Sequence, residues 1–414
     1  MRILVVGATG RIGRAVAWDL VRDPDVEQLG LVGRTQQSLQ ALQTALGNDA
    51  RIRCHAVDVA SSELVEVLKQ YQVAVLTLPD RRSSYGCVEA ALAAGTHAVD
   101  VLEEYHRSPD VDEREGLRLP VGMSVREYGE DLHQRAQRRG ITLLSGMGFA
   151  PGLSNIALGH ALRQLDSAHT AVSRVGGIPT AHSAAQHPLR YMVTWSFEHV
   201  LREYCVQVCI RKGGHSVEVE AGSEREAFTF ARFGQSAPLE CAITPGMPSI
   251  PFTRPELKSF AEKTIRWPGH WQAIQTLKEC GLLSLSPVRC GEHSIVPRQL
   301  LAAVLTPALV PRPDDRDVCV LYSTVRGEKA GRPVRVEHYL WHESQPHAEQ
   351  SAMMQVTGFP AALAARLVCR GAIPHRGIVA PEDAITEALY PGFLRDLAAR
   401  GIFIEETQAE DGPP

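Results

Sequence analysis

An apolar stretch that runs directly into a glycine-rich turn constrains this chain more than any other feature. Residues 3–6 (Ile-Leu-Val-Val) have the length and composition of a buried strand, glycines follow at positions 7, 10 and 13, and a helical pattern begins at once. Such spacing permits a tight turn, lets the backbone approach a phosphate and allows close packing of the helix. The pattern predicts a dinucleotide pyrophosphate site, although an unliganded strand-to-helix turn has the same spacing. The residues expected to contact the cofactor here are Gly7, Thr9, Gly10, Arg11, Ile12 and Gly13.

The end of the second apolar run, residues 28–33, bears on which dinucleotide binds. A carboxylate at this position accepts from the ribose 2′-hydroxyl of NAD, whereas a small residue followed by arginine accommodates the 2′-phosphate of NADP. The chain has Gly33, Arg34 and Thr35 here, and no acid before Asp49. We therefore expect NADP, with NAD possible, and expect Arg34 and Thr35 to contact it; a solvated loop arginine is the alternative.

Further parallel strands are predicted at 53–58, 73–78 and 96–101, because each is a short apolar run followed by a helical or turn pattern. Ligands of open parallel sheets lie beyond the carboxyl ends of the strands. The residues expected there are Asp58, Leu78 and Pro79 for the cofactor, and Asp100 as a proton acceptor or partner of a substrate ammonium group. Each aspartate has the alternative role of a helix cap or a loop ion pair.

Two later segments connect this region to the rest of the chain. Residues 102–123 are rich in charge and contain two prolines, which predicts an exposed excursion. Residues 145–155 hold three glycines and a proline after a predicted strand. We expect Gly148 and Pro151 to help cover the nicotinamide, with a simple interdomain turn as the alternative.

The sequence pattern changes near residue 170. From there on, short runs of alternating apolar and polar residues replace the alternation of strand and helix patterns. Such runs favour an antiparallel or mixed sheet with helices on one face. The predicted fold class is α/β, with a Rossmann dinucleotide-binding domain and an α+β substrate or dimerisation domain. The expected divisions are 1–150 for the Rossmann domain, 151–345 for the second domain, 346–405 for C-terminal helices that return to the Rossmann domain, and 406–414 for a tail.

Composition excludes several other classes of protein. The 414 residues carry 47 acidic and 43 basic side chains, a balance that gives no reason to expect nucleic acid or a membrane as partner. Nine cysteines without a Cys-x-x-Cys pair are typical of reduced thiols, and no leader or apolar run of about eighteen residues is apparent. We expect a cytoplasmic protein. We expect no metal, because no carboxylate arrangement completes the spacing of His338 and His342.

Four motifs carry a resemblance to a known family. They are residues 148–155 (GFAPGLSN), 175–179 (VGGIP), 191–196 (YMVTWS) and 266–270 (RWPGH), and residues 356–359 (VTGF) agree with them. The chain resembles the saccharopine dehydrogenase-like family and is most similar to its L-lysine 6-dehydrogenase branch. The resemblance implies a homodimeric, nicotinamide-dependent oxidoreductase acting on the CH–NH bond of a lysine-like amino acid.

Side chains in these motifs are candidates for the chemistry. Arg266 is expected to bind the substrate α-carboxylate, because a guanidinium group matches a carboxylate with two hydrogen bonds; a structural ion pair is the alternative. His270 is expected to act as acid or base, or else to cap or hydrogen-bond locally. The hydroxyl groups expected to line the amine pocket are those of Tyr191, Thr194 and Ser196.

The sequence is compatible with three functions. The first is an ε-amine dehydrogenase of the lysine 6-dehydrogenase type, which releases ammonia. The second is a saccharopine-type reductase or opine dehydrogenase, which reduces an imine of an aldehyde and an amino acid and needs a second cationic pocket, for which Arg190, Arg202 and Arg211 are available. The third is a regulator that binds NADP(H) without turnover. The Gly33-Arg34-Thr35 sequence looks more like the NADP-using saccharopine reductases.

Overall fold

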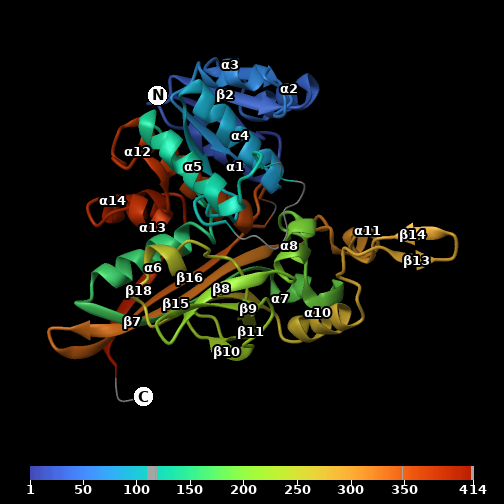
Figure 1. Ribbon diagram of the computed structural model, residues 1–414, viewed down its shortest axis with the longest axis vertical. Helices are drawn as coiled ribbons and strands as arrows, with labels where there is room; N and C mark the ends of the chain where they lie inside the picture. Colours follow the sequence, from blue (N-terminus) through green and yellow to red (C-terminus); the bar gives the residue numbers. More distant parts are fainter. Residues whose placement is uncertain (110–116, 118, 347, 412–414) are drawn as a thin grey trace. The chain divides into compact units, whose positions relative to one another are not determined.

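The computed structural model of the chain describes residues 1–109, 117, 119–346 and 348–411, and these form two compact units (Figure 1). Unit 1 comprises residues 1–164, 247–254 and 354–402. Unit 2 comprises residues 165–246, 255–353 and 403–414. The first boundary lies at 164 instead of the predicted 150, because the helix after the 145–152 loop packs within unit 1.

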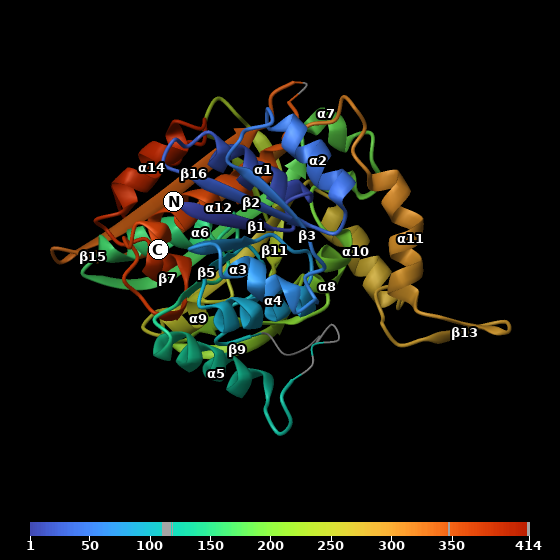
Figure 2. The same cartoon turned by 90° about the horizontal axis from the view of Figure 1, so that it is seen from above.

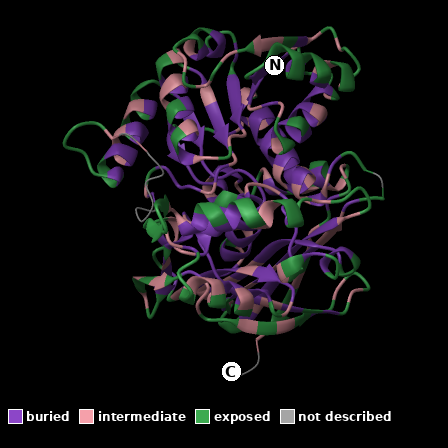
Figure 3. Ribbon diagram, turned by 90° about the vertical axis from the view of Figure 1, so that its right-hand side faces the viewer, coloured by how far each residue is buried: buried purple, intermediate pink, exposed green. Residues whose placement is uncertain are grey.

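Unit 1 is built on a seven-stranded parallel sheet with the order β17-β6-β5-β4-β1-β2-β3. Its strands are β1 (Arg2–Val6), β2 (Gln28–Gly33), β3 (Ile52–Ala56), β4 (Val73–Leu76), β5 (His97–Asp100), β6 (Thr142–Leu144) and β17 (Gly377–Val379). Parallel strands covered on both faces are apolar throughout, and the strands of this sheet are largely buried while its helices carry exposed outer faces (Figure 3). The predicted Rossmann architecture is confirmed.

The longer helices of unit 1 are α1 (Arg11–Val21), α2 (Gln36–Ala45), α4 (Arg81–Ala94), α5 (Val125–Arg138), α6 (Leu153–Arg163), α12 (Ala352–Cys369) and α14 (Tyr390–Ala398). Short helices lie at α3 (Glu63–Leu68), α9 (Ile250–Thr253) and α13 (Pro381–Ala384). The C-terminal part of the chain completes this unit, since β17 extends the sheet by pairing with β6. The rings of Trp18 on α1 and Phe359 on α12 stack with centroids 5.6 Å apart.

Helix α12 requires a correction to the expectation that no apolar run approaches membrane-spanning length. Its 18 residues have a mean hydropathy of 1.3, enough by length and composition to cross a membrane, but 72% of the stretch is buried inside the protein. It also carries Arg366, whose buried guanidinium pairs with Asp19 (2.9 Å) and Asp23 (2.7 Å). These contacts are those of a core helix.

Unit 2 is built on a mixed nine-stranded sheet, as predicted. Its central path is β10-β11-β12-β7-β15-β16-β18, and β8 and β9 pair beside β12. The strands are β7 (Ser167–Pro179), β8 (Gln207–Lys212), β9 (His215–Glu220), β10 (Glu226–Phe230), β11 (Ala237–Ile243), β12 (Ser259–Arg266), β15 (Asp317–Lys329), β16 (Arg332–Glu343) and β18 (Glu405–Glu410). Only β7 and β12 run parallel among the described pairs of this sheet.

Helices and one projecting arm complete unit 2. The helices are α7 (Ala181–Ala184), the 3-10 turn η1 (Pro188–Arg190), α8 (Phe197–Glu203), α10 (His270–Glu279) and α11 (Pro297–Leu309). A separate hairpin of β13 (Val288–Cys290) and β14 (His293–Ile295) precedes α11 and extends away from it (Figure 2).

Two predictions about irregular segments were wrong in part. Within the predicted exposed excursion, Leu102, Glu104, Tyr105 and His106 are buried, because the polar groups among them find buried partners. Residues 110–116 and 118 of that segment lie outside the described residues. The predicted tail is ordered up to Glu410, since β18 pairs with β16; residues 412–414 lie outside the described part.

Candidate active site

The glycine turn of unit 1 has the geometry that a pyrophosphate requires. Gly7 has φ +81°, and a Cβ there would lie 2.9 Å from the carbonyl oxygen of Thr77. A Cβ on Gly13 would lie 2.3 Å from the carbonyl oxygen of Gly7, so the helix reaches the strand only without a side chain. Gly10 caps α1, and the first turn of a helix presents amide groups without intrahelical partners. The residues present therefore fit a dinucleotide.

The turn also lies at the topological switch point of the sheet. Strand β1 has β4 on one side and β2 on the other, and open α/β sheets bind ligands in the crevice where the strand order reverses. Leu78 and Pro79 follow β4 at this edge, and Leu78 lies close to Gly7, with its Cδ2 3.3 Å from the Cβ position there. The first helical turn beyond them is capped by Asp80, which accepts from the amide of Ser83 (2.8 Å).

Arg34 and Thr35 lie where the 2′-position of the ribose was expected. Both are exposed and follow β2 directly. Thr35 caps α2 by accepting from the amide of Ser38 (3.3 Å), whereas the Arg34 side chain makes no hydrogen bond or ion pair with any described residue. Asp58 is exposed beyond β3 and accepts from the amide of Ala60 (2.9 Å) within a turn, whereas the N-cap of α3 is Ser62. No described contact tests the proposed cofactor roles of these residues.

The loop at residues 145–152 is buried and largely closed on itself. The amide of Gly148 donates to the carbonyl oxygen of Pro151 (2.9 Å), and the amide of Leu153 returns to Gly148 (2.9 Å). The amide of Met147 donates to the carbonyl oxygen of Asp100 (2.6 Å), so the loop is anchored at the end of β5. Gly148 and Pro151 therefore shape the backbone here, and their contact with the nicotinamide stays a prediction.

Asp100 lies at the carboxyl end of β5 inside a buried polar network. Its carboxylate accepts from the hydroxyl of Ser84, from the amide of Leu102 (2.9 Å) and from His106 Nε2 (3.1 Å). The adjacent Glu104 carboxylate is buried too. It pairs with Arg81 and accepts from Tyr85 (2.9 Å). Burial raises the pKa of Tyr85 well above its usual value, so Tyr85 remains a neutral donor.

His106 is a residue that the sequence did not single out. Its Nε2 contacts Asp100, while Nδ1 is buried and has no hydrogen-bond partner among the described residues. A histidine against an aspartate at a strand end is a common arrangement for moving a proton. The only sequence signal was its position six residues after Asp100.

Arg266 ends β12 in unit 2 and is 5% exposed. Its Nε donates to the hydroxyl oxygen of Tyr204 (3.0 Å) and its Nη1 to the carbonyl oxygen of Ile265 (2.9 Å). Within the described part of the chain, no carboxylate lies within 4.0 Å of this guanidinium and Nη2 has no hydrogen bond. The guanidinium therefore makes no ion pair within 4.0 Å among the described residues, although the buried Glu203 carboxylate acts on it electrostatically.

His270 is linked to Arg266 through the hydroxyl group of Tyr204. Its Nδ1 donates to the carbonyl oxygen of Leu189 (2.9 Å), which leaves Nε2 to accept from Tyr204 (3.1 Å). Burial, together with the charge of Arg266, lowers the pKa of His270 to about 3. These contacts fit the local hydrogen-bonding role named as the alternative, and the acid–base role of His270 stays a prediction.

Of the three hydroxyl residues predicted for the amine pocket, one lies at this cluster. The Tyr191 ring lies beneath Arg266, with the guanidinium carbon 5.3 Å from the ring centroid. Thr194 is buried beside Gly177, where a Cβ would lie 3.7 Å from its hydroxyl. Ser196 is half-buried and caps α8 without a side-chain bond.

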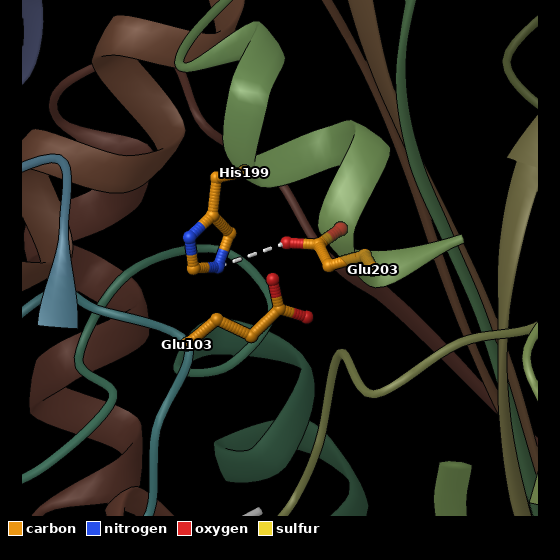
Figure 4. A group of neighbouring side chains, drawn as sticks. All are labelled: Glu103, His199 and Glu203. Carbon is orange, nitrogen blue, oxygen red and sulfur yellow. Dashed lines mark ion pairs between the residues drawn. The ribbon is translucent and has the colours of Figure 1, made fainter. Parts of the chain in front are cut away.

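Helix α8 holds a buried pair that the sequence reasoning missed. His199 and Glu203 are one turn apart, and Nε2 of His199 lies 3.3 Å from a carboxylate oxygen of Glu203 (Figure 4). The i,i+4 spacing of the two residues was the available signal.

The arginines named for a second cationic pocket differ in what they do. Arg211 is buried and donates to the backbone carbonyl groups of Gly214, Pro255 and Leu257, so its role is structural. Arg190 is exposed and contacts the carbonyl oxygen of Pro268 (3.4 Å). Arg202 is almost fully buried on α8. His338, considered above for its spacing with His342, lies on β16 and pairs with Glu406 of β18 (2.8 Å).

Comparisons with known proteins identify the family. Residues 3–144 match the saccharopine dehydrogenase NADP-binding domain, and residues 148–402 match the saccharopine dehydrogenase C-terminal domain. The chain belongs to the saccharopine dehydrogenase family. The family resemblance noted from the motifs is confirmed, and the first domain matches an NADP-binding domain, as predicted.

Individual relatives agree with the family. A saccharopine dehydrogenase [NADP(+), L-glutamate-forming] of Pyricularia oryzae is 28% identical over 170 residues, which are 37% of this chain and 35% of that protein. An alpha-aminoadipic semialdehyde synthase of Arabidopsis thaliana is 22% identical over 308 residues, 67% of this chain and 26% of the relative. The chain thus matches about a third and a quarter of the lengths of these two proteins.

The fold agrees over the whole chain with one solved structure. The apo saccharopine dehydrogenase (L-Glu forming) of Saccharomyces cerevisiae superposes with a TM-score of 0.74 at 18% identity and covers 99% of both chains. Two of these three proteins are named as saccharopine dehydrogenases, and the assignment of this chain to the L-lysine 6-dehydrogenase branch stays a prediction.

Proposed function

We propose that this chain is an NADP-dependent reductase of the saccharopine type. In this reaction the imine of an aldehyde and an amino acid is reduced to a secondary amine, and the reverse reaction oxidises that amine. The observation that carries the proposal is the buried guanidinium of Arg266, which lacks a carboxylate partner among the described residues. Support also comes from the NADP-binding domain family and from the L-glutamate-forming relative.

The proposed roles follow from what each residue can donate or accept. The bound cofactor supplies the hydride that converts the C=N bond into CH–NH, and the nitrogen takes a proton. Arg266 holds a substrate carboxylate, with Tyr204 fixing the guanidinium plane through Nε. Asp100 and His106 form the candidate proton-handling pair on the nucleotide-binding unit, because they are the titratable groups at the end of β5.

The second candidate is oxidative deamination of a lysine-like ε-amine, favoured by the four motifs at 148–155, 175–179, 191–196 and 266–270. It differs in its product, since ammonia leaves in place of an amino acid. It also needs only one carboxylate site, whereas an imine built from two amino acids brings more than one carboxylate to the enzyme.

The deciding experiment measures cofactor oxidation or reduction with both NADP(H) and NAD(H) against saccharopine, lysine, ornithine and mixtures of an aldehyde with an amino acid. Release of glutamate from saccharopine, without ammonia, is the expected result. Ammonia release from lysine would replace the proposal with the second candidate. Tight NADP(H) binding without turnover of any of these compounds would identify a regulator instead.

A further inference from the structure

Unit 1 contains a cavity of about 460 Å³ that the proposed reaction does not use. It lies beside the edge strand β17, between that strand, α5 and the turn after β17. The sheet order places β17 four strands from β1. At about 4.8 Å per strand, this is about 19 Å from the glycine turn that binds the cofactor phosphates.

Cationic and hydrogen-bond-donating side chains dominate the cavity wall. Four arginines line it, together with two histidines, and among the described residues its acidic lining side chains are Glu382 and Asp383. The volume is that of a site for a small metabolite.

The two acidic residues are already occupied. Asp383 pairs with Arg254 (2.7 Å). Glu382 is fully buried, and its carboxylate accepts hydrogen bonds from Asn155 (3.0 Å), Ser249 (2.6 Å) and Thr253 (2.6 Å). Both carboxylates are therefore already engaged, Asp383 by a cation and Glu382 by three neutral donors.

Other lining side chains retain donors. Arg376 uses Nη1 on Thr142 and on nearby carbonyl groups, but has no carboxylate partner among the described residues. Arg107 contacts Glu130 through Nε (2.9 Å) at an exposed pair, and its side chain also hydrogen-bonds with Tyr105. His133 accepts from the amide of Ile378 at Nδ1 (3.0 Å), which in the neutral ring leaves the proton on Nε2.

The protonation state of His133 also leaves a donor available in the cavity wall. Burial, together with the charge of Arg107, lowers its pKa, so the ring is neutral and Nε2 is a donor. Thr386, whose side chain carries a hydroxyl group, lines the same wall. Donors that converge from several directions suit the tetrahedral oxygens of a phosphate better than a planar carboxylate, and arginine is the usual phosphate-binding side chain.

We propose that this cavity binds the phosphate group of a small phosphorylated metabolite, at a site separate from that of the cofactor. Arg376 and Arg107 supply the charge, and His133 and Thr386 supply directional hydrogen bonds. Tyr105 and Arg107, the sequence neighbours of His106, both line the cavity, whereas His106 itself does not. The proposal does not depend on which amine or imine the enzyme reduces.

The test is calorimetric titration of the full chain with inorganic pyrophosphate in saturating NADP, so that the cofactor phosphate site is already filled. We expect binding with a Kd below about 1 mM. We expect Arg107→Ala and Arg376→Ala each to weaken it at least about tenfold. Arg370→Ala is the matched control, because Arg370 is an exposed arginine of the same unit that pairs with Asp25 (2.6 Å), and its affinity should equal that of the wild type.

Arg107→Ala keeps the proposal testable if loss of the Arg376 contacts unfolds the protein, since Arg107 makes an exposed pair. Absence of binding to folded, NADP-saturated protein would overturn the proposal. So would an affinity that Arg107→Ala leaves unchanged.

Discussion

Arg266 and Tyr204 are joined by a hydrogen bond of 3.0 Å from the arginine Nε to the phenol oxygen, with both side chains buried in unit 2. The phenol in turn donates to His270 Nε2 (3.1 Å), and His270 is anchored on the carbonyl oxygen of Leu189. The three residues form one directional chain, Arg266 to Tyr204 to His270. The chain fixes the guanidinium by one edge, and Nη2 has no hydrogen bond among the described residues.

Tyr204→Phe is expected to raise KM for the carboxylate-bearing substrate about tenfold, with a smaller change in kcat. A hydrogen bond to a charged group contributes about 1.5–3 kcal/mol, and losing it frees the guanidinium without removing its charge. Steady-state kinetics check this. Tyr322→Phe is the control, because Tyr322 donates to Glu337 (2.9 Å) elsewhere in unit 2 and should leave KM unchanged. An unaltered KM in Tyr204→Phe would remove its positioning role.

Arg266→Ala is expected to raise KM at least tenfold, which is about 1.4 kcal/mol. Arg266→Lys should recover only part of this loss, because an ammonium group cannot reproduce the two parallel hydrogen bonds of a guanidinium. The control is Arg332→Ala, which removes an exposed arginine of unit 2 paired with Glu410. A smaller rise in KM would mean that Arg266 does not bind the substrate carboxylate.

Acid should destabilise the protein partly through His270. Its pKa is about 6.5 in an unfolded chain and about 3 when folded, so between these values the unfolded state binds more protons. The stability contributed by the neutral ring is therefore complete above about pH 6.5 and is lost progressively as pH falls towards 3. His270→Gln should flatten this part of the dependence of unfolding free energy on pH, measured by urea denaturation. A parallel pH dependence in the two proteins would show that the pKa of His270 is the same in the folded and unfolded states.

The architecture was readable from the sequence, but the surroundings of individual polar groups were not. Gly7, Gly10 and Gly13 have local geometric requirements, so their spacing predicted the turn and the helix that follows it. Arg266 was recognised as a candidate from a motif, yet its environment depends on Tyr204, 62 positions earlier in the chain. Long-range contacts of this kind leave no periodic signal.

The same limitation explains what the sequence did not reveal. In the sequence, His270 is a histidine next to a Pro-Gly turn. The burial and the charge of Arg266 that lower its pKa become visible only in the structure. Glu104 and His106 were predicted to be exposed because their segment is rich in charge. Their buried partners, Arg81 and Asp100, lie on other elements of the fold. Charged side chains are usually exposed, but they can be buried when they pair with a partner of opposite charge.

Arg34→Asp is expected to shift the cofactor preference from NADP towards NAD. The substitution removes a cation available to the 2′-phosphate and supplies a carboxylate that can accept from a ribose 2′-hydroxyl. The measurement is kcat/KM for both cofactors with the same substrate. Arg2→Asp, at the opposite end of the sheet strands, is the control and should leave the ratio unchanged. A wild-type enzyme that uses NAD as well as NADP would already refute the role of Arg34.

Gly13→Ala is expected both to destabilise unit 1 and to weaken NADP binding. The new methyl group would lie 2.3 Å from the carbonyl oxygen of Gly7 and 2.7 Å from Ala8 Cα, and backbone atoms cannot give way as a flexible side chain does. Overpacking of this kind typically costs about 1–3 kcal/mol, and it displaces the amides of the first turn of α1 from the phosphates.

Gly86→Ala is the matched control for Gly13→Ala, because Gly86 lies in the interior of α4 with open space around its Cβ position. It should stabilise the protein by up to about 1 kcal/mol through helix propensity and leave NADP affinity unchanged. Urea denaturation and NADP titration of the two variants separate the general effect of replacing a helical glycine from the specific need for a bare backbone at residue 13. Equal NADP affinity in Gly13→Ala and the wild type would mean that the cofactor phosphates bind away from this turn.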